Sequence, residues 1–135
     1  MIRLFTDGAY STKSKCGGVG IVFLRNDTLV GYYKRKFDYA GVTISRMELS
    51  AAIIALRCIK DTTDHIELIS DSMYVIGCLT NPTWERKENK DLWNLIDKEI
   101  NRIGKERISY IHVRGHQDNE YNNMADQLAV IARTE

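Results

Sequence analysis

Few features of this sequence suggest a disulfide-linked, zinc-finger or membrane protein. Its three cysteines, Cys16, Cys58 and Cys78, are odd in number and widely spaced, and they lack the close Cys/His pairs of a structural zinc site. No stretch approaches the roughly 20 apolar residues that span a membrane, and the N-terminus has no apolar segment of the signal-peptide kind. We therefore expect a soluble protein without a membrane partner, in the reducing setting of the cytoplasm.

An excess of charge of one sign is also lacking. Lys and Arg number 19 against 18 Asp and Glu, a formal net charge of +1, so no global positive field argues for binding nucleic acid. Any such binding must come from local geometry. The chain has no internal repeat, low-complexity tract or linker. Its length and its 44% hydrophobic content predict one compact domain over residues 1–135, with one active centre, and we expect a monomer.

Short apolar runs bounded by turn residues predict five strands. The first run ends at Asp7 and Gly8, which are expected to form a turn. The connections between the first three runs are short, so these strands should form an antiparallel meander. The predicted strands cover residues 2–6, 19–24, 28–37, 65–70 and 107–113.

Helical spacing of apolar residues predicts four helices. Ser45 and Glu48 match a capping box at the start of the first helix, and Asn81 with Pro82 should end the second. A strand, a helix and another strand in this order suggest a parallel crossover. The predicted helices cover residues 45–60, 72–79, 90–103 and 119–132. Three apolar residues of the last helix are expected to face inward: Met124, Leu128 and Ile131.

Four acidic residues are candidates for catalysis, and each also has a structural explanation. Asp7 suits a turn before Gly8. Glu48 suits the capping box of the first helix, and Asp71 suits the N-cap of the second. Asp126 lies on the last helix, where most acidic side chains are merely solvated. Taken singly, none of the four requires a chemical role.

The four acids gain significance when they are placed on the predicted sheet. If the first and fourth strands are adjacent and parallel, Asp7 and Asp71 stand side by side, and their carboxylates repel each other unless a cation lies between them. Glu48, in the first turn of the crossover helix, can reach the same end of the sheet. Three acids at one edge make the oxygen-rich kind of site that Mg²⁺ or Mn²⁺ prefers.

Five motifs occur in order along nearly the whole chain: FTDGAY, SRMELSAAIIAL, SDSMYVI, NKDLW and VRGHQDNEYNNMADQLA. Together they resemble the successive motifs of the type 1 ribonuclease H (RNase HI) family. The resemblance implies an α/β ribonuclease H-like fold, in which helices pack on a five-stranded mixed sheet of three antiparallel and two parallel strands. This implied fold agrees with the order of elements predicted above.

The resemblance also implies a metal-dependent endonuclease that hydrolyses the RNA strand of RNA/DNA hybrids and leaves 5′-phosphate and 3′-hydroxyl ends. Asp7, Glu48, Asp71 and Asp126 would form its catalytic set and bind two Mg²⁺ ions, for which Mn²⁺ can substitute. Asp7 would bridge the ions, with Asp71 and Glu48 on one and Asp126 on the other. Two ions about 4 Å apart can activate the attacking water and neutralise the leaving oxygen.

The histidines receive different interpretations. His116 follows a glycine in a polar loop within the last motif, so an exposed imidazole there could move protons or help to release product. We count it with the catalytic residues; the alternative is a surface histidine without a task. His65 and His112 lack such a context and are interpreted as structural.

Contacts with the hybrid require recognition of 2′-hydroxyl groups, since only that group separates RNA from DNA at a given position. Glu48 is placed by the resemblance at one of them. Trp84 could be a platform for the DNA strand, and its alternative is packing against Trp93. The candidate substrate-binding residues are Gly8, Ala9, Thr43, Ser45, Trp84 and Asn122.

The sequence departs from the family pattern in two places. Ile44, Ser45 and Met73 stand where well-studied cellular members carry asparagines and a glutamine. Residues 80–90 replace the helix and basic loop with which many bacterial members grip the duplex, so we expect a weaker affinity for the hybrid.

Two other functions remain open: a catalytically inactive module that binds hybrids, and a related DNA nuclease of the same fold. The complete acid set disfavours the first, and the RMEL helix and the last motif disfavour the second. The missing basic loop would also suit a domain that is attached to, or recruited by, a replication polymerase.

Overall fold

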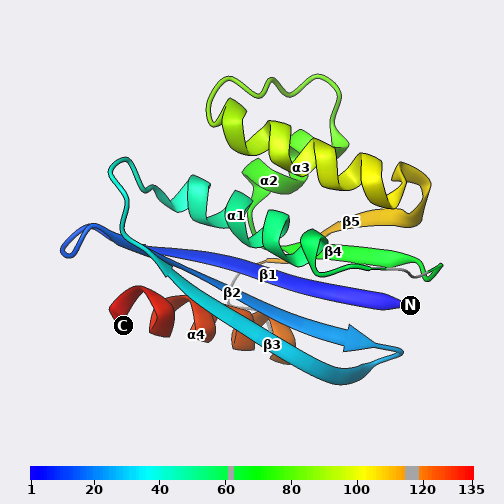
Figure 1. Cartoon of the computed structure of the whole chain (residues 1–135), viewed down its shortest axis with the longest axis horizontal. Helices are drawn as coiled ribbons and strands as arrows, with labels where there is room; N and C mark the ends of the chain where they lie inside the picture. The colour runs from blue at the N-terminus through cyan, green and yellow to red at the C-terminus, as the bar shows by residue number, and fades with distance from the viewer. Residues whose placement is uncertain (61–62, 115–118) are drawn as a thin grey trace.

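The computed structural model describes residues 1–60, 63–114 and 119–135, in which five strands form one mixed sheet flanked by helices (Figure 1). The strands are β1 (Ile2–Ser11), β2 (Cys16–Arg25), β3 (Thr28–Phe37), β4 (Ile66–Ser70) and β5 (Ile108–His112). The helices are α1 (Ile44–Arg57), α2 (Met73–Thr80), α3 (Lys90–Ile103), the short 3₁₀ helix η1 (Lys105–Arg107) and α4 (Glu120–Thr134). None of the described helices is long and apolar enough to cross a membrane.

The sheet order is β3-β2-β1-β4-β5, with β1, β2 and β3 antiparallel and β1, β4 and β5 parallel. This arrangement confirms the predicted meander, the predicted pairing of the first and fourth strands, and the mixed five-stranded sheet. Asn26 and Asp27 have positive φ angles of 49° and 66°, as the tight turn between β2 and β3 requires.

The first strand is longer than predicted. We expected a turn at Asp7 and Gly8, but β1 continues through both residues to Ser11, and Asp7 pairs with Gly20 of β2. The prediction was wrong because β2 is itself ten residues long and supplies backbone partners along all of β1. The chain turns only at residues 12–15. Asp7 is therefore held inside a strand.

Two caps also differ from the predictions. The N-cap of α1 is Thr43, whose hydroxyl accepts a hydrogen bond from the Arg46 N–H at 3.1 Å, so the predicted Ser45–Glu48 capping box is wrong. Ser72, rather than Asp71, caps α2 by accepting from the Val75 N–H at 3.2 Å. The structural explanations for Glu48 and Asp71 are thereby removed, because neither carboxylate caps its helix.

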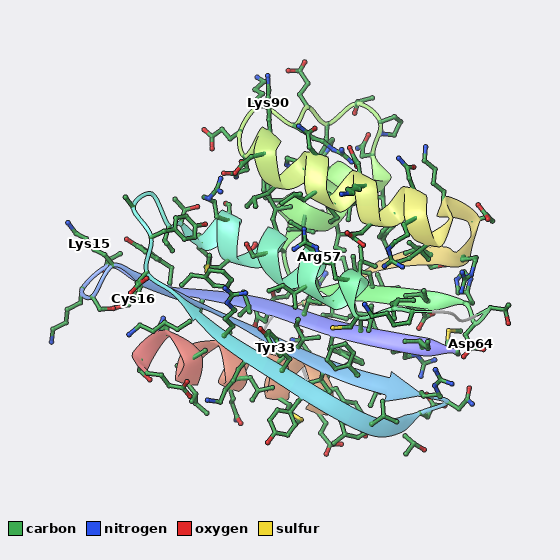
Figure 2. All side chains as sticks on the ribbon, in the orientation of Figure 1. Lys15, Cys16, Tyr33, Arg57, Asp64 and Lys90 are labelled. Carbon is green, nitrogen blue, oxygen red and sulfur yellow. The ribbon has the colours of Figure 1, made fainter. Side chains whose placement is uncertain are left out.

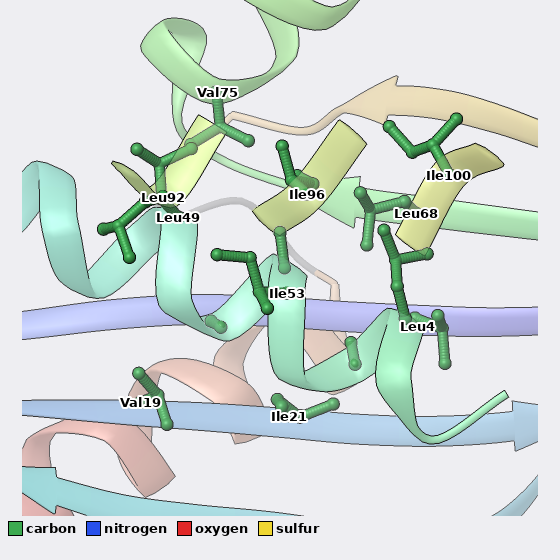
Figure 3. Close-up of a cluster of buried hydrophobic side chains, with 14 of the residues drawn as sticks. Leu4, Val19, Ile21, Leu49, Ile53, Leu68, Val75, Leu92, Ile96 and Ile100 are labelled. Carbon is green, nitrogen blue, oxygen red and sulfur yellow. The ribbon is translucent and has the colours of Figure 1, made fainter. Parts of the chain in front are cut away.

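Helices lie on both faces of the sheet. Helices α1, α2 and α3 lie on one face, and α4 crosses the other against β1, β2 and β3 (Figure 1). Figure 3 shows the larger core, in which side chains of α1 and α3 meet side chains of the sheet. Its labelled residues are Leu4, Val19, Ile21, Leu49, Ile53, Leu68, Val75, Leu92, Ile96 and Ile100.

A smaller core lies between α4 and the sheet. Leu128 is buried there, as predicted, and Met124 packs at its margin, but Ile131 is 49% exposed and that prediction was wrong. The inward face of α4 is made largely of small residues, because the helix lies almost in contact with the strand backbone. Its buried residues are Asn122, Ala125, Leu128, Ala129 and Ala132.

Candidate active site

The four candidate acids meet where β4 ends: three lie in β1, α1 and α4, and Asp71 directly follows β4. The last parallel pair between β1 and β4 joins Thr6 to Ser70, so Asp7 and Asp71 are the next residues along these neighbouring strands. Glu48 lies near the start of α1, and Asp126 lies in the first half of α4. Asp7, which lies in β1 beyond the end of β4, is the most deeply buried acid of the group.

Two glycines allow the helices that carry Glu48 and Asp126 to come this close. A Cβ atom on Gly8 would lie 2.5 Å from the backbone nitrogen of Glu48, and one on Gly20 would lie 2.1 Å from the carbonyl oxygen of Ala125. Contacts this short do not occur with a real side chain, so each position requires glycine. Gly8 thus brings α1 onto β1, and Gly20 brings α4 onto β2.

Asp7 is buried with part of its carboxylate unsatisfied. The residue is 4% exposed, and its Oδ1 accepts a hydrogen bond from the Gly8 N–H at 2.8 Å. Its Oδ2 has no hydrogen-bond donor within the described part of the chain. Burial raises the pKa of Asp7 from its usual 3.8 to about 8, and the nearby carboxylates of Asp71 and Asp126 add to the rise. A buried carboxylate of this kind is stabilised by a cation.

The pKa values of Asp71 and Glu48 are raised as well. Burial raises the pKa of Asp71, and the charge of Asp126 raises it further. Burial also raises the pKa of Glu48; a hydrogen bond from Ser72 lowers it in part, and the charge of Asp71 adds to the rise. The site therefore concentrates more negative charge than its surroundings compensate.

The donor set suits a hard divalent cation. Carboxylate oxygens are the ligands that Mg²⁺ and Mn²⁺ prefer, and Oδ2 of Asp7 is a buried donor without a partner. Outside residues 61–62 and 115–118, no three acidic, histidine or cysteine side chains lie close enough together to hold one metal ion in their present positions. The acids nevertheless lie close enough to alter one another's pKa. Asp7, Glu48, Asp71 and Asp126 are accordingly the candidate ligands.

His112 lies beside this site, although we interpreted it as structural from the sequence. Its Nε2 lies 3.1 Å from the backbone carbonyl oxygen of Asp71, and its proximity lowers the pKa of Asp71. The pairing of Ser70 with His112 across β4 and β5 could have indicated this position. His65 contacts the hydroxyl of Ser109 at 2.7 Å. Ser109 lies near the start of β5, at the opposite end of the strand from His112 and the acids. His116, the predicted catalytic histidine, lies outside the described residues.

Five of the six candidate substrate contacts differ in how far they are exposed. Gly8 and Ala9 are buried in β1, and the Gly8 N–H is already bonded to Asp7. Thr43 is exposed, and its hydroxyl can still donate a hydrogen bond while it caps α1. Ser45 is half-buried in the first turn of α1, and Asn122 is 2% exposed on α4, one turn before Asp126. Only Thr43, of these five, offers an exposed side chain.

Trp84 is the sixth candidate. Its indole packs on Gly77 of α2, where an added Cβ would lie 2.1 Å from the ring, and 41% of the residue remains exposed. The face of Trp93 is instead covered by the guanidinium of Arg86, at 4.3 Å from the ring centroid. Trp84 lines a surface hollow of about 400 Å³ together with Tyr74 and neighbouring residues. Its exposed ring is available for stacking.

A polar network that the sequence did not predict joins the starts of three helices. Arg46 of α1 donates two hydrogen bonds to the carboxylate of Asp91, at 3.0 and 2.7 Å, and a third to Asn89 at 3.3 Å. Asn89 and the Trp93 indole both donate to the hydroxyl of Tyr74, at 3.2 and 3.0 Å. The network fixes α1, α2 and α3 to one another near Glu48 and Asp71.

Comparison with known proteins gives consistent results. The family model described as RNase H matches residues 1–134. The chain is 35% identical to the ribonuclease H of Acetivibrio thermocellus, over 95% of this chain and 91% of that protein.

Two solved structures have a similar fold. LC11-RNase H1, crystallised in complex with an RNA/DNA hybrid, has a TM-score of 0.81 at 17% identity, over 99% of this chain and 97% of that one. The prototype foamy virus protease-reverse transcriptase has a TM-score of 0.80 at 19% identity, over 99% of this chain but 21% of that one. At these identities the two structures support the fold alone.

Proposed function

Because this chain belongs to the ribonuclease H family, we propose that it hydrolyses the RNA strand of RNA/DNA hybrids with two divalent metal ions, leaving 5′-phosphate and 3′-hydroxyl ends. The observation that carries the proposal is Asp7: a buried carboxylate with an unpartnered oxygen, adjacent to Asp71 and influenced by Asp126. A module that only bound hybrids would have no use for this arrangement, which weakens the folded protein until a cation is bound.

The carboxylates of Asp7, Glu48, Asp71 and Asp126 would hold the ions, with Mg²⁺ as the expected metal and Mn²⁺ as a substitute. When bound, two such ions activate the attacking water and neutralise the charge on the leaving 3′ oxygen. The chain itself contributes rigidity: Asp7 is held in a strand, and Gly8 holds α1 against that strand. His116 is proposed to move a proton during product release.

Recognition of the hybrid is proposed to depend on both strands. Glu48 would contact a 2′-hydroxyl of the RNA, which distinguishes the hybrid from duplex DNA. Thr43 would bind a phosphate of the DNA strand through its exposed hydroxyl, and Trp84 would stack against the same strand. LC11-RNase H1, which has a similar fold, was crystallised with a substrate of this class.

We propose further that residues 1–135 act as one ribonuclease H domain and that a replication polymerase recruits or carries it. The foamy virus protein is an example of the second arrangement, since the region of similar fold there is about one fifth of a protease-reverse transcriptase chain. The chain can be tested alone, because the proposed reaction requires only its own acids and the metal.

The test is incubation with an end-labelled RNA/DNA hybrid, with duplex DNA and with duplex RNA, each with Mg²⁺ or with EDTA. We expect cleavage of the RNA strand of the hybrid in Mg²⁺ alone, with products that a 5′-phosphate-dependent exonuclease degrades. Binding of the hybrid without cleavage would establish the inactive module instead. Cleavage of duplex DNA would establish a DNA nuclease of the same fold.

A matched pair of variants connects the activity to the site. Asp7→Asn should abolish cleavage, because it removes the buried carboxylate with little change in shape. Asp38→Asn removes an equal charge from an exposed residue and should leave the rate unchanged. Equal rates for the two variants would contradict the site assignment.

A further inference from the structure

One part of the sheet is not covered by a helix. On the face that carries α1, this helix packs on β1 and β2, while α4 covers the opposite face (Figure 1). In that view no helix lies in front of β3, and α4 passes behind it. Strand β3 is also the last strand on its side of the sheet, so one edge of its backbone is unpaired within the sheet.

The first half of β3 exposes large apolar and aromatic side chains. Tyr33, on the α1 face, is 36% exposed, and Val30 is 61% exposed. Leu29 and Tyr32, 43% and 61% exposed, belong to the α4 face, because their partners on β2 do. Proteins normally shield an edge strand with charges or a cover, because an exposed apolar edge pairs with other chains. Figure 2 shows Tyr33 on β3 and Arg57 on the neighbouring α1.

Two hollows lie between β3 and α1, and we call the surface that contains them the β3 groove. The first, about 390 Å³, is lined by residues that include Phe23 and Gly31 of the sheet and Ile59 after α1. A Cβ added to Gly31 would meet no atom within 4 Å, so the space above this glycine is open. The second hollow, about 170 Å³, is lined by residues that include Arg35 and Arg57.

The residues of β3 that line the two hollows are spaced so that one extended segment can reach both. Residues on one face of a strand recur every second position, and Gly31, Tyr33, Arg35 and Phe37 belong to the α1 face because their partners on β2 do. From Gly31 to Phe37 the strand rises roughly 20 Å. A segment of seven or so residues, paired with β3, would therefore reach both hollows.

The rim of the groove is positive. The guanidinium of Arg35 lies over the Phe37 ring, 4.8 Å from its centroid, and no acid in the described part of the chain forms an ion pair with it. The Arg57 side chain is 50% exposed and donates a hydrogen bond to Glu99 at 3.5 Å; Glu99 also pairs with Arg102, so the three side chains together keep one positive charge. On the other face of the same strand, Lys34 and Lys36 both bind Glu135.

We propose that the β3 groove binds an extended segment of a partner protein in which apolar and acidic residues share one face. The segment would add to the sheet as a sixth strand beside β3. An apolar side chain opposite Gly31 would fill the first hollow, and carboxylates toward the other end would pair with Arg35 and Arg57. This surface is separate from the acids of the active site, so the proposal does not depend on the proposed function.

The probe is a fluorescein-labelled peptide of nine residues, with threonine at every second position and leucine or aspartate at the others. Fluorescence anisotropy should show saturable binding, which a peptide with lysine in place of aspartate should lose by about tenfold or more. A peptide interrupted by proline should also fail, because it cannot pair along the strand. Hydrogen exchange of the β3 amides should slow when the acidic peptide binds.

Two variants locate the site. Gly31→Val fills the open space and favours the strand, so it should leave the fold intact yet weaken binding by about tenfold. Arg35→Glu should weaken it similarly, whereas Lys98→Glu, an exposed residue of α3, should have no effect. Thermal unfolding at or above the temperature of the unaltered protein, together with unchanged hybrid cleavage, would show that these variants remain folded.

Several results would overturn the proposal. These are absence of binding up to millimolar peptide, equal binding of the lysine or proline peptide, and binding that Gly31→Val leaves unchanged. A dimer in sedimentation equilibrium that Gly31→Val dissociates would assign the groove to a second copy of this chain instead.

Discussion

Asp7 shows most clearly how the fold alters a single residue. Its neighbours in sequence are those of an ordinary turn aspartate, yet it is buried in a strand with one carboxylate oxygen unpartnered. Its identity as a candidate could be predicted from the motif. Its burial could not, because that burial depends on how closely α1 and α4 approach the sheet at Gly8 and Gly20.

Asp7→Asn should stabilise the metal-free protein. Because the folded pKa of Asp7 is about 8 against 3.8 for an unperturbed aspartate, the folded state loses stability as pH rises through this interval. The variant removes that loss, so the gain should be small at pH 4 and reach on the order of 5 kcal/mol above pH 8, because each unit of difference between the two pKa values corresponds to about 1.4 kcal/mol.

Urea unfolding of both proteins at pH 4, 6 and 8 in EDTA measures this gain. Asp38→Asn is the control, since its side chain is exposed. A destabilised Asp7→Asn at pH 8 would show that the carboxylate is already compensated within the folded chain.

The affinity for Mg²⁺ should rise with pH up to about 8. Asp7 must lose its proton to act as a ligand, and burial raises the pKa of Asp71 and Glu48 as well. At pH 7 binding should therefore release about one proton per chain. Calorimetry in two buffers of different ionisation enthalpy measures the release, and Asp7→Asn should remove most of it.

At the scale of elements, helix α1 is positioned by a glycine on the strand beneath it. Gly8→Ala would force the start of α1 away from β1, because the new Cβ would lie 2.5 Å from the Glu48 nitrogen. We expect a loss of about 1–3 kcal/mol of stability and a larger loss of cleavage rate, since Glu48 moves with the helix.

Gly31→Ala is the matched control for this change, because its Cβ meets nothing within 4 Å. It should be neutral or stabilising by about 0.5–1 kcal/mol. Thermal unfolding and single-turnover cleavage would be measured for both variants. Full activity of Gly8→Ala would show that the approach of α1 to β1 is not needed for the site.

The segment between α2 and α3 is short, with no helix in residues 81–89. It carries few cations, and Arg86 among them is already bonded to Asp97 at 2.8 and 2.7 Å. Lys87 is 79% exposed and contacts Glu85 only at 3.8 Å. It is therefore the cation of this segment most available to a phosphate.

Lys87→Glu should raise KM for the hybrid by about threefold to tenfold and leave kcat and stability unchanged. It should also make the dependence of KM on salt shallower, because one phosphate contact is lost. Lys98→Glu on α3 is the charge-matched control. An equal effect of both variants would indicate long-range attraction rather than a contact at Lys87.

For the whole molecule, the order of the elements could be predicted, because apolar periodicity is a local signal, and the mixed sheet was implied by the family resemblance and by the lengths of the connections. Strand β3 and helix α3 have the predicted bounds. The errors arose where tertiary packing outweighs that signal: β2 extends β1 through Asp7 and Gly8, and small residues let α4 lie so close that Ile131 faces outward. The motifs identified the acids, but their mutual approach is a property of the packed fold.

The site also joins the two ends of the chain. Asp7 lies on the first strand and Asp126 on the last helix, and Arg133 of that helix donates to the Tyr10 carbonyl at 3.0 Å. A metal ion shared by these acids would act as a cross-link that closes a loop of nearly the whole sequence. Bound metal should consequently slow global unfolding by holding α4, the last element in the sequence, against β1.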